Sequence, residues 1–434
     1  MSSTLFEQFR KNLAVANQED ISTSYAEITK RLNKDYWDSS SETANSLQVG
    51  SYGRQTAIRN VSDLDMIFEL PQKVFDRVSE VQNNGPSQLL QEIRQSIKAR
   101  YPNTKVNGDG QVVVVSFGKY VVEVLPAFLQ MDGSYRYGDS NNGGSWNNYC
   151  LPRKEISAVN EVNKRCNRNL KRVAKMVRAW KNVHGAAMSG MLIDTLVYNF
   201  FRDNTDYDQK SYGSYPELVR DIFSFLANRP EQQYWLAPGS NSRVATKGKF
   251  QRKAKKAAAK AQEALDADNE KTKQRLWREI FGPLFPSVQT GTLSKAFESY
   301  AEASNTEQYI EDENPVDIQY ELEIGYDVAY AGKHEARIKF MEKTFPWLKL
   351  GRNLEFFVVD CNVPEPYEML WKVRNVGLLA EKKNQIRGEL MRDAGRRRLT
   401  ERTSFGGHHF VECYVLKDNV CVARDRIEVP IELS

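Results

Sequence analysis

The stretch GSYGRQTAIRNVSDLD occupies residues 50–65 and joins a glycine-serine pair to two acids. The segment around its end, VSDLDMIFEL, is rich in strand formers and stops before Pro71. Side chains two apart on a strand leave the same face, so Asp63 and Asp65 should stand side by side. Their apolar neighbours indicate a buried strand, where unpaired carboxylates are costly. A bound cation would remove that cost, and a solvated edge strand is the alternative.

A third acid stands in the segment YVVEVLPAF, residues 120–128. This segment follows QVVVVSF and the two-residue turn Gly118-Lys119, a pattern that predicts a β-hairpin. A buried ion pair with an arginine would explain Glu123 if it stood alone. Beside Asp63 and Asp65, a carboxylate triad from two neighbouring strands explains it better. We therefore predict that these three acids are metal ligands and catalytic residues.

The pair Gly50-Ser51 is predicted to bind a phosphate group beside this triad. Glycine has no Cβ, so backbone amides approach a ligand closely, and amides at a helix N-terminus or nest bind phosphate oxygens. The Ser51 hydroxyl adds a donor, although the stretch does not follow the GxxxxGK[ST] pattern of a Walker A loop. Together these residues predict nucleotidyl transfer. Two Mg²⁺ ions, or Mn²⁺ in their place, would activate a hydroxyl and neutralise pyrophosphate.

The composition is that of a globular protein, with 41% hydrophobic and 27% charged residues. No apolar run is long enough to span a bilayer, and the N-terminus lacks the apolar core of a secretory signal. A cytoplasmic protein without membrane attachment is therefore expected. The five cysteines contain no CxxC pair, which predicts reduced thiols. A net charge of +5 suits a protein that handles phosphates and does not by itself indicate duplex binding.

Hydrophobic spacing predicts an α+β fold in which a mixed sheet with helices is followed by a helical half and a β-rich C-terminal domain. Helices are expected within residues 1–40 and over 86–100, 155–183 and 189–202. Residues 131–150, rich in Gly, Asn, Ser and Tyr, are expected to form a loop. The run within 238–275, basic first and acidic later, predicts a solvated surface helix.

Three stretches carry a resemblance to a known family: GSYGRQTAIRNVSDLDMIF, VVEVLPAF and LPRKEISAVNEVNKRCNRNLKRVAKMVRAWK. The pattern resembles the DNA polymerase β-like nucleotidyltransferase superfamily and, more narrowly, the bacterial cyclic GMP-AMP synthase-like nucleotidyltransferases (CD-NTases) with their SMODS domains. The resemblance covers roughly residues 1–290. It implies template-independent joining of nucleoside triphosphates into cyclic or linear oligonucleotides. In that family such products act on a separate effector protein in anti-phage defence.

One residue departs from the family pattern. The third metal ligand of the family is usually aspartate, and Glu123 stands there in this chain. The extra methylene moves the carboxylate by on the order of 1 Å, which bears on the metal geometry.

The C-terminal part also resembles a known domain. The segments YELEIGYDV, PEPYEMLWKVRNVG and TSFGGHHFVECYV are similar to the AGS-C domain, a proposed sensor often fused to SMODS domains. The implied organisation is a catalytic core with an N-terminal helix over 1–150, a helical nucleotide-binding half over 151–290 and an AGS-C-like domain over 315–434.

The resemblance further implies contacts to the triphosphate. Relatives hold the β- and γ-phosphates with basic residues on the helix NLKRVAKMVRAWK and a polar residue that opens the next helix. The matching positions are Lys175, Arg178 and Ser189, the first two on one helix face. A tyrosine that stacks on the donor base is also expected. The segment 131–150 offers Tyr135, Tyr137 and Tyr149 for that role.

Three functions are compatible with these residues: a signal synthase that uses nucleoside triphosphates, a nucleic-acid-tailing enzyme of the poly(A)- or CCA-adding kind, and an inactive nucleotide-sensing module. A tailing enzyme needs a basic surface with aromatic platforms for a strand. The segment 247–260 is the candidate surface, and Phe250 is its one aromatic residue. Nucleic-acid binding is therefore not indicated, and the intact acids argue against an inactive module.

Overall fold

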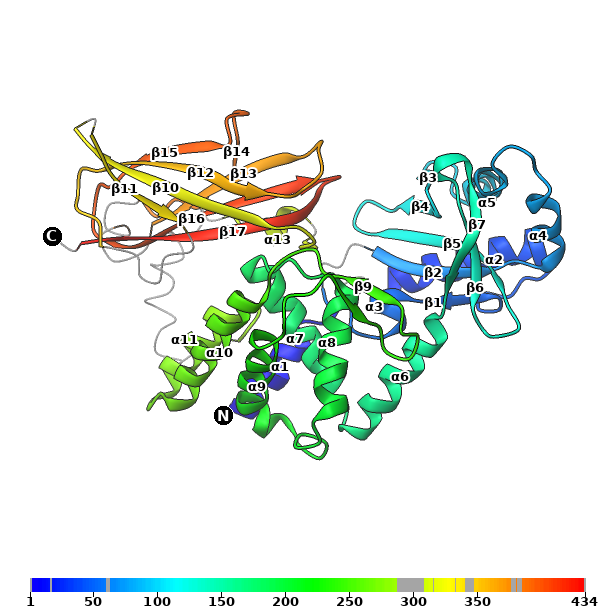
Figure 1. The fold of residues 1–434 in the computed structure, drawn as a ribbon, viewed down its shortest axis with the longest axis horizontal. Helices are drawn as coiled ribbons and strands as arrows, with labels where there is room; N and C mark the ends of the chain where they lie inside the picture. The colour runs from blue at the N-terminus through cyan, green and yellow to red at the C-terminus, as the bar shows by residue number, and fades with distance from the viewer. Residues whose placement is uncertain are drawn as a thin grey trace. The chain divides into compact units, whose positions relative to one another are not determined.

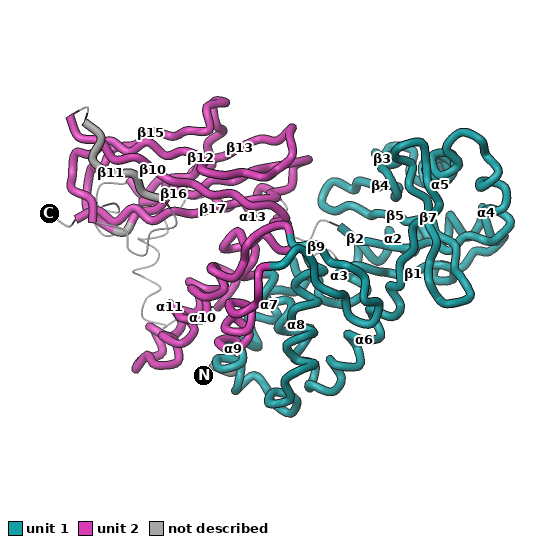
Figure 2. Tube along the Cα trace, in the orientation of Figure 1, with its two compact units in different colours: residues 1–178, 190–218, 232–246 teal, residues 179–189, 219–231, 247–434 magenta. Residues whose placement is uncertain are grey.

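The structure, a computed structural model, describes residues 2–15, 18–59, 63–286 and 308–432, the last range with gaps at 315, 332, 340–346, 376–379 and 381–384. The chain divides into two compact units, which are coloured separately in Figure 2. Unit 1 comprises residues 1–178, 190–218 and 232–246, and unit 2 comprises residues 179–189, 219–231 and 247–434.

Unit 1 contains a seven-stranded mixed sheet (Figure 1). Five strands lie in the order β1-β2-β5-β4-β3, and β6 and β7 continue from β5. Strands β2 and β5 run parallel, while the other neighbours are antiparallel. The strands are β1 (Ser46–Gln48), β2 (Asp63–Glu69), β3 (Lys105–Asp109), β4 (Val112–Ser116), β5 (Val121–Leu129), β6 (Tyr135–Asp139) and β7 (Ser145–Cys150).

Helices α2 (Gln18–Trp37) and α5 (Gly85–Arg100) cover one face of this sheet. Alternate residues of β2 and β5, such as Leu64 and Val122, are buried in the core beneath them. The residues between, which include the three predicted acids, leave from the opposite face because the side-chain period of a strand is two. Alternation in the sequence thus places the acids away from the helices.

The strand predicted around Asp63, the hairpin around Gly118 and the helix over 86–100 are confirmed as β2, β4–β5 and α5. The prediction of a loop over 131–150 is wrong, because these residues form the β6–β7 hairpin. Tyr135 is fully buried on β6 and fixes this strand to the sheet. The short strands were hidden by the glycines and asparagines of the turn between them, since those residues are typical of loops.

Helices make up most of the rest of unit 1, together with a small hairpin of β8 (Tyr234–Leu236) and β9 (Arg243–Ala245). The helices are α1 (Ser2–Asn12), the one-turn α3 (Gly50–Gly53), α4 (Gln72–Ser79), α6 (Pro152–Arg165) and α8 (Gly190–Asp203). Helices α7 (Asn169–His184) and α9 (Tyr215–Ala227) contribute residues to both units.

Unit 2 contains the β-rich domain that the sequence predicts. Two four-stranded antiparallel sheets, in the orders β11-β10-β12-β15 and β14-β13-β16-β17, pack their apolar faces together. The strands are β10 (Leu322–Tyr330), β11 (Lys333–Lys339), β12 (Asn353–Cys361), β13 (Glu368–Arg374), β14 (Met391–Arg392), β15 (Arg398–Arg402), β16 (Gly407–Lys417) and β17 (Val420–Ile431). The short helix α13 (Ile310–Glu313) precedes them.

Strand β17 lies at the edge of the second sheet. Segments that do not belong to this sheet pair with part of its free side. Parallel bridges join Val316 to Cys421 and Leu348 to Ile431. The backbone N–H of Gln319 also donates to the carbonyl of Val422 at 2.9 Å. Segments before β10 and before β12 therefore satisfy backbone groups along this edge.

The surface helix predicted within 238–275 is only partly right. The segment forms α10 (Gln251–Asp266) and α11 (Glu270–Phe281), which lie beside each other (Figure 1). Four alanines of α10 are buried: Ala254, Ala257, Ala261 and Ala264. Their spacing of three and four makes a narrow buried stripe, which the notion of a fully solvated helix missed because alanine is a weak hydrophobic signal.

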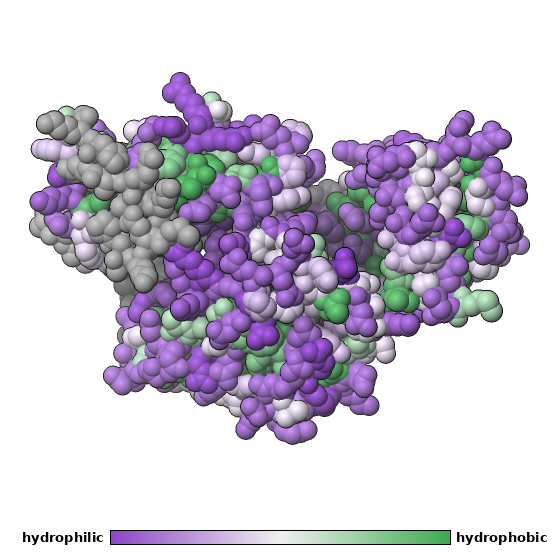
Figure 3. Space-filling model, viewed as in Figure 1, coloured by the Kyte–Doolittle hydropathy of each residue, from purple (hydrophilic) through white to green (hydrophobic). Residues whose placement is uncertain are grey.

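None of the helices in the described ranges is long and apolar enough to cross a membrane. The face of the molecule in Figure 3 is mostly hydrophilic, with hydrophobic residues in small patches.

Candidate active site

The three predicted acids lie on neighbouring parallel strands of unit 1. In the register of β2 and β5, Asp65 stands opposite Glu123, and Asp63 stands opposite Val121. All three acids are half-buried and share the face that the helices leave open. The structure therefore gathers three carboxylates at one end of two adjacent strands.

Burial and neighbouring negative charge raise the pKa of Glu123 to about 7. Burial is the largest cause, followed by the charges of Asp65, Asp63 and Asp109. Among the described residues, the charged groups that shift this pKa are all carboxylates. The structure thus gives no support to a buried ion pair between Glu123 and an arginine.

Gly50 lies directly against one of these carboxylates. Its backbone is in the left-handed region, with φ at 58°, and a Cβ there would overlap Asp65 Oδ2 and lie 2.7 Å from Asp65 Cγ. The backbone N–H of Val49 also donates to the carbonyl of Asp65 at 2.9 Å. Gly50 and Ser51 open α3, so the structure joins the glycine-serine turn to the acids as one site.

Lys175 lies half-buried on α7 in a positive environment. Burial lowers its pKa, and the charges of Arg10 and Arg178 lower it further. A lysine held among other cations is a suitable partner for a polyanion. Ser189 directly precedes α8 and is half-buried. Its part in phosphate binding stays a prediction.

Arg178 is more deeply placed than an exposed phosphate ligand would be. Its Nη2 donates to Asp194 Oδ2 at 2.8 Å, to the carbonyl of Gly190 at 2.9 Å and to Thr56 Oγ1 at 3.1 Å. Asp194 is fully buried on α8. Sequence reasoning missed Asp194, although a signal was available: it is a lone acid in the apolar run GMLIDTLVYNFF, just as Glu123 is in its strand.

The three candidate tyrosines differ in accessibility. Tyr135 is fully buried, with its hydroxyl donating to Glu69 and accepting from Arg153 Nε at 2.8 Å. It is therefore committed to the fold. Tyr149 is 53% exposed and Tyr137 is half-buried, so these two retain surface for a ring contact.

The three acids are of the kind that can bind a metal ion. Carboxylate oxygens are the ligands that Mg²⁺ prefers in proteins, and the charges of Asp65 and Asp63 add to burial in raising the pKa of Glu123. As the side chains stand in the described residues, no three His, Cys, Asp or Glu side chains are arranged to hold one ion. The chemistry of the acids suits a cation, but their side chains as they stand do not enclose one.

The raised pKa of Glu123 makes a prediction about stability. Because this pKa is about 7 in the folded state, against an ordinary value of 4.5, the folded protein keeps a proton there that the unfolded chain loses between those pH values. The free energy of unfolding should therefore fall as pH rises from 4.5 to 7, by on the order of 3 kcal/mol at most.

The substitution Glu123→Gln removes this titration. In the presence of a chelator, the variant should melt at a higher temperature than the wild type at about pH 8 and at nearly the same temperature at about pH 5. Asp132→Asn is the control. Hydrogen bonds to Ser134 lower the pKa of the exposed Asp132, so this carboxylate stays ionised at both pH values and its replacement should have the same effect on melting at each. Equal melting of Glu123→Gln and wild type under the alkaline condition would contradict the electrostatic assignment.

Comparison with known proteins is consistent with this geometry. Residues 1–163 match the Second Messenger Oligonucleotide or Dinucleotide Synthetase (SMODS) domain. Residues 304–432 match the Adenylyl/Guanylyl and SMODS C-terminal sensor domain (AGS_C). No curated protein sequence matches the chain.

Solved structures resemble the fold at low sequence identity. The Escherichia coli MS115-1 CdnC:HORMA-deltaN complex matches with 14% identity and a TM-score of 0.50, over 66% of this chain and 99% of that chain. Vibrio cholerae DncV, a cyclic AMP-GMP synthase, matches with 14% identity and a TM-score of 0.42, over 56% of this chain and 69% of that chain. The chain therefore carries a SMODS domain followed by a C-terminal AGS_C sensor domain.

Proposed function

We propose that this chain joins nucleoside triphosphates, without a template, into a short cyclic or linear oligonucleotide signal and releases pyrophosphate. One observation carries the proposal: Gly50 lies against the Asp65 carboxylate, which in turn stands in register with Glu123. The turn proposed to bind phosphate thereby lies next to the set of carboxylates. The description of the SMODS domain as a synthetase of oligonucleotide or dinucleotide messengers supports the class of product.

The residues divide the work as follows. Asp63, Asp65 and Glu123 would hold Mg²⁺, two ions in the complete site with Mn²⁺ as an alternative. When bound, the metal would supply charge neutralisation and a more acidic attacking hydroxyl. The amides of Gly50 and Ser51 would hold phosphate oxygens, and Lys175 would add positive charge. Because positioning dominates such reactions, most of the protein's contribution lies in keeping these groups fixed.

We further propose that the oligonucleotide acts on a separate effector protein in anti-phage defence, and that the AGS_C domain controls the synthesis. The sensor description of that domain supports the second part. The match of residues 1–163 to the SMODS domain supports the first.

A nucleic-acid-tailing activity is the second candidate, and the basic segment 247–260 speaks against it. Phe250, its one aromatic residue, is fully buried, so it offers no stacking platform. Two of its lysines pair with acids: Lys249 with Glu231 at 2.8 Å and Lys260 with Glu279. These cations are committed to ion pairs within unit 2.

Product analysis tests the proposal. Purified protein with labelled ATP, GTP, CTP and UTP and Mg²⁺ is expected to yield short products that resist phosphatase, and pyrophosphate in step with them. The chelator EDTA should stop the reaction, since the carboxylates would lose the cation. Labelled RNA or DNA primers that grow longer would instead support tailing. Absence of every product, with ribo- and deoxynucleotides, would contradict both enzymatic functions.

A further inference from the structure

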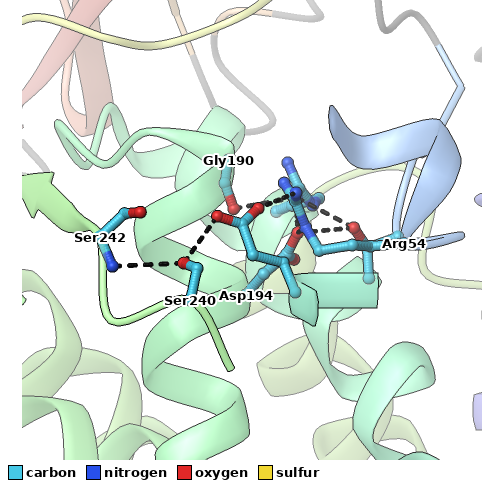
Figure 4. Close-up of polar contacts among 8 residues, drawn as sticks. Arg54, Gly190, Asp194, Ser240 and Ser242 are labelled. Carbon is cyan, nitrogen blue, oxygen red and sulfur yellow. Dashed lines mark hydrogen bonds and ion pairs between the residues drawn. The ribbon is translucent and has the colours of Figure 1, made fainter. Parts of the chain in front are cut away.

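A buried charge cluster is linked to the residues that follow the glycine-serine turn, and Figure 4 shows its polar contacts. Its centre is Asp194, which is fully buried on α8. A single oxygen, Oδ2, accepts from Arg54 Nε at 2.8 Å, Thr56 Oγ1 at 2.9 Å and Arg178 Nη2 at 2.8 Å. Burial raises the pKa of Asp194, but the charges of Arg178 and Arg54 more than offset it, so the pKa lies below its ordinary value. Asp194 is therefore a carboxylate that two guanidinium groups hold ionised.

The backbone ties this cluster to the turn. The N–H of Arg54 donates to the carbonyl of Gly50 at 3.2 Å, and the N–H of Thr56 donates to the carbonyl of Ser51 at 2.8 Å. The N–H of Ala57 also donates to the Ser51 carbonyl at 3.2 Å. Two of the three residues whose side chains hold Asp194, Arg54 and Thr56, thus also hold Gly50 and Ser51 through their backbone amides.

The cluster is closed on its other sides. Arg54 Nη1 lies 3.7 Å from Glu155 Oε2, so two arginines face two carboxylates. Glu155 Oε1 accepts a hydrogen bond from Ser240 Oγ at 2.9 Å, and Ser240 is labelled in Figure 4. A Cβ on Gly190 would overlap Arg178 Nη1 and lie 3.1 Å from Cζ. The geometry leaves Arg178 little freedom to turn toward another ligand.

We infer that Asp194 is a positioning residue that fixes the Gly50-Ser51 turn through Thr56 and Arg54, and that Arg178 serves this cluster rather than the triphosphate. The inference rests on the proposed function for its catalytic part. A buried carboxylate with three donors is a stiff anchor, because breaking it leaves charges unpaired away from water. The turn that it anchors bears the amides assigned to phosphate oxygens, so a small displacement of the cluster would misplace the phosphates.

Thr56 offers a cleaner test than Asp194, whose loss would leave the buried Arg178 without its carboxylate partner and Arg54 with Glu155 alone, and would endanger folding. Thr56→Val keeps the shape but removes the hydroxyl, while Thr56→Ser keeps the hydroxyl. For the triphosphates that the wild type uses, Thr56→Val should lower kcat by about 10- to 100-fold with KM changed by less than about threefold. Thr56→Ser should stay close to wild type.

Hydrogen exchange provides a readout that does not depend on activity. In Thr56→Val the backbone amides of residues 56 and 57 should exchange faster than in wild type and in Thr56→Ser, since their bonds to Ser51 lose support. Unchanged exchange at these amides would overturn the inference, as would a wild-type kcat or a raised KM with unchanged kcat. If the wild type itself made no product, the proposed function would fail, and the exchange result alone would decide whether the cluster holds the turn.

Discussion

Asp63→Asn combined with Asp65→Asn is expected to lower product formation by at least about 1,000-fold, because the paired change removes two of three proposed metal ligands. Both side chains keep their size, so the strand should remain in place. Pyrophosphate release under saturating triphosphates and Mg²⁺ measures the effect. Asp132→Asn on the β5–β6 turn removes an exposed acid and should leave the rate unchanged.

A second measurement separates loss of chemistry from loss of folding. The charges of Asp65 and Asp63 help to raise the pKa of Glu123, so their removal relieves repulsion in the metal-free protein. In chelator at about pH 8, the double variant should therefore melt no lower than the wild type. A double variant that kept the wild-type rate would place the metal elsewhere, and one that melted much lower would show that the acids are structural.

Gly50→Ala should lower the rate by on the order of 100-fold or more, even though all three acids remain. The added Cβ would overlap Asp65 Oδ2, so either the turn or the carboxylate must move. The left-handed backbone at this residue adds strain for any side chain. Pyrophosphate release and the Mg²⁺ concentration required for half-maximal rate are the quantities to measure, and both should worsen.

Gly133→Ala is the matched control. Gly133 has φ at 81°, and no atom lies within 4 Å of the position that a Cβ would take, so alanine there meets the backbone strain without the overlap. It should cost some stability and leave the rate near wild type. Equal rates for Gly50→Ala and wild type would mean that Asp65 can move aside and still function. The reaction would then not depend on the close approach of the Gly50 backbone to the Asp65 carboxylate.

The parts of the site that the sequence could predict are those with a local pattern. Alternation placed Asp63 and Asp65 on one face, and a lone acid in an apolar strand pointed to Glu123. Local pattern could not show that β2 and β5 run parallel with Asp65 opposite Glu123, since that register depends on the order of strands in the sheet. The family resemblance gave Arg178 a contact to the triphosphate, and helical periodicity could not show what packs against that face of the helix.

The sequence also failed to predict the β6–β7 hairpin and the role of Asp194, for physical reasons. Strands β6 and β7 lie in a segment dominated by turn formers, and this composition predicted a loop. The sequence did not show that Tyr135 is buried in a strand. Asp194 belongs to no motif, and its role appears only when α8 meets the residues after the turn, 140 residues earlier in the chain for Arg54. Long-range packing of this kind leaves little trace in one sequence beyond a charge where none is expected.

The edges of the β-rich domain in unit 2 decide how it can meet another molecule. An unpaired edge strand is a template on which a further chain can add, the route to aggregation and to strand-addition binding. Here β14 is only two residues long, β15 carries charged side chains at Arg398, Glu401 and Arg402, and β17 is bridged at Val316 and Leu348. At these three edges an added strand would meet a very short strand, a row of charges or partly bridged backbone, and each of these features disfavours strand addition.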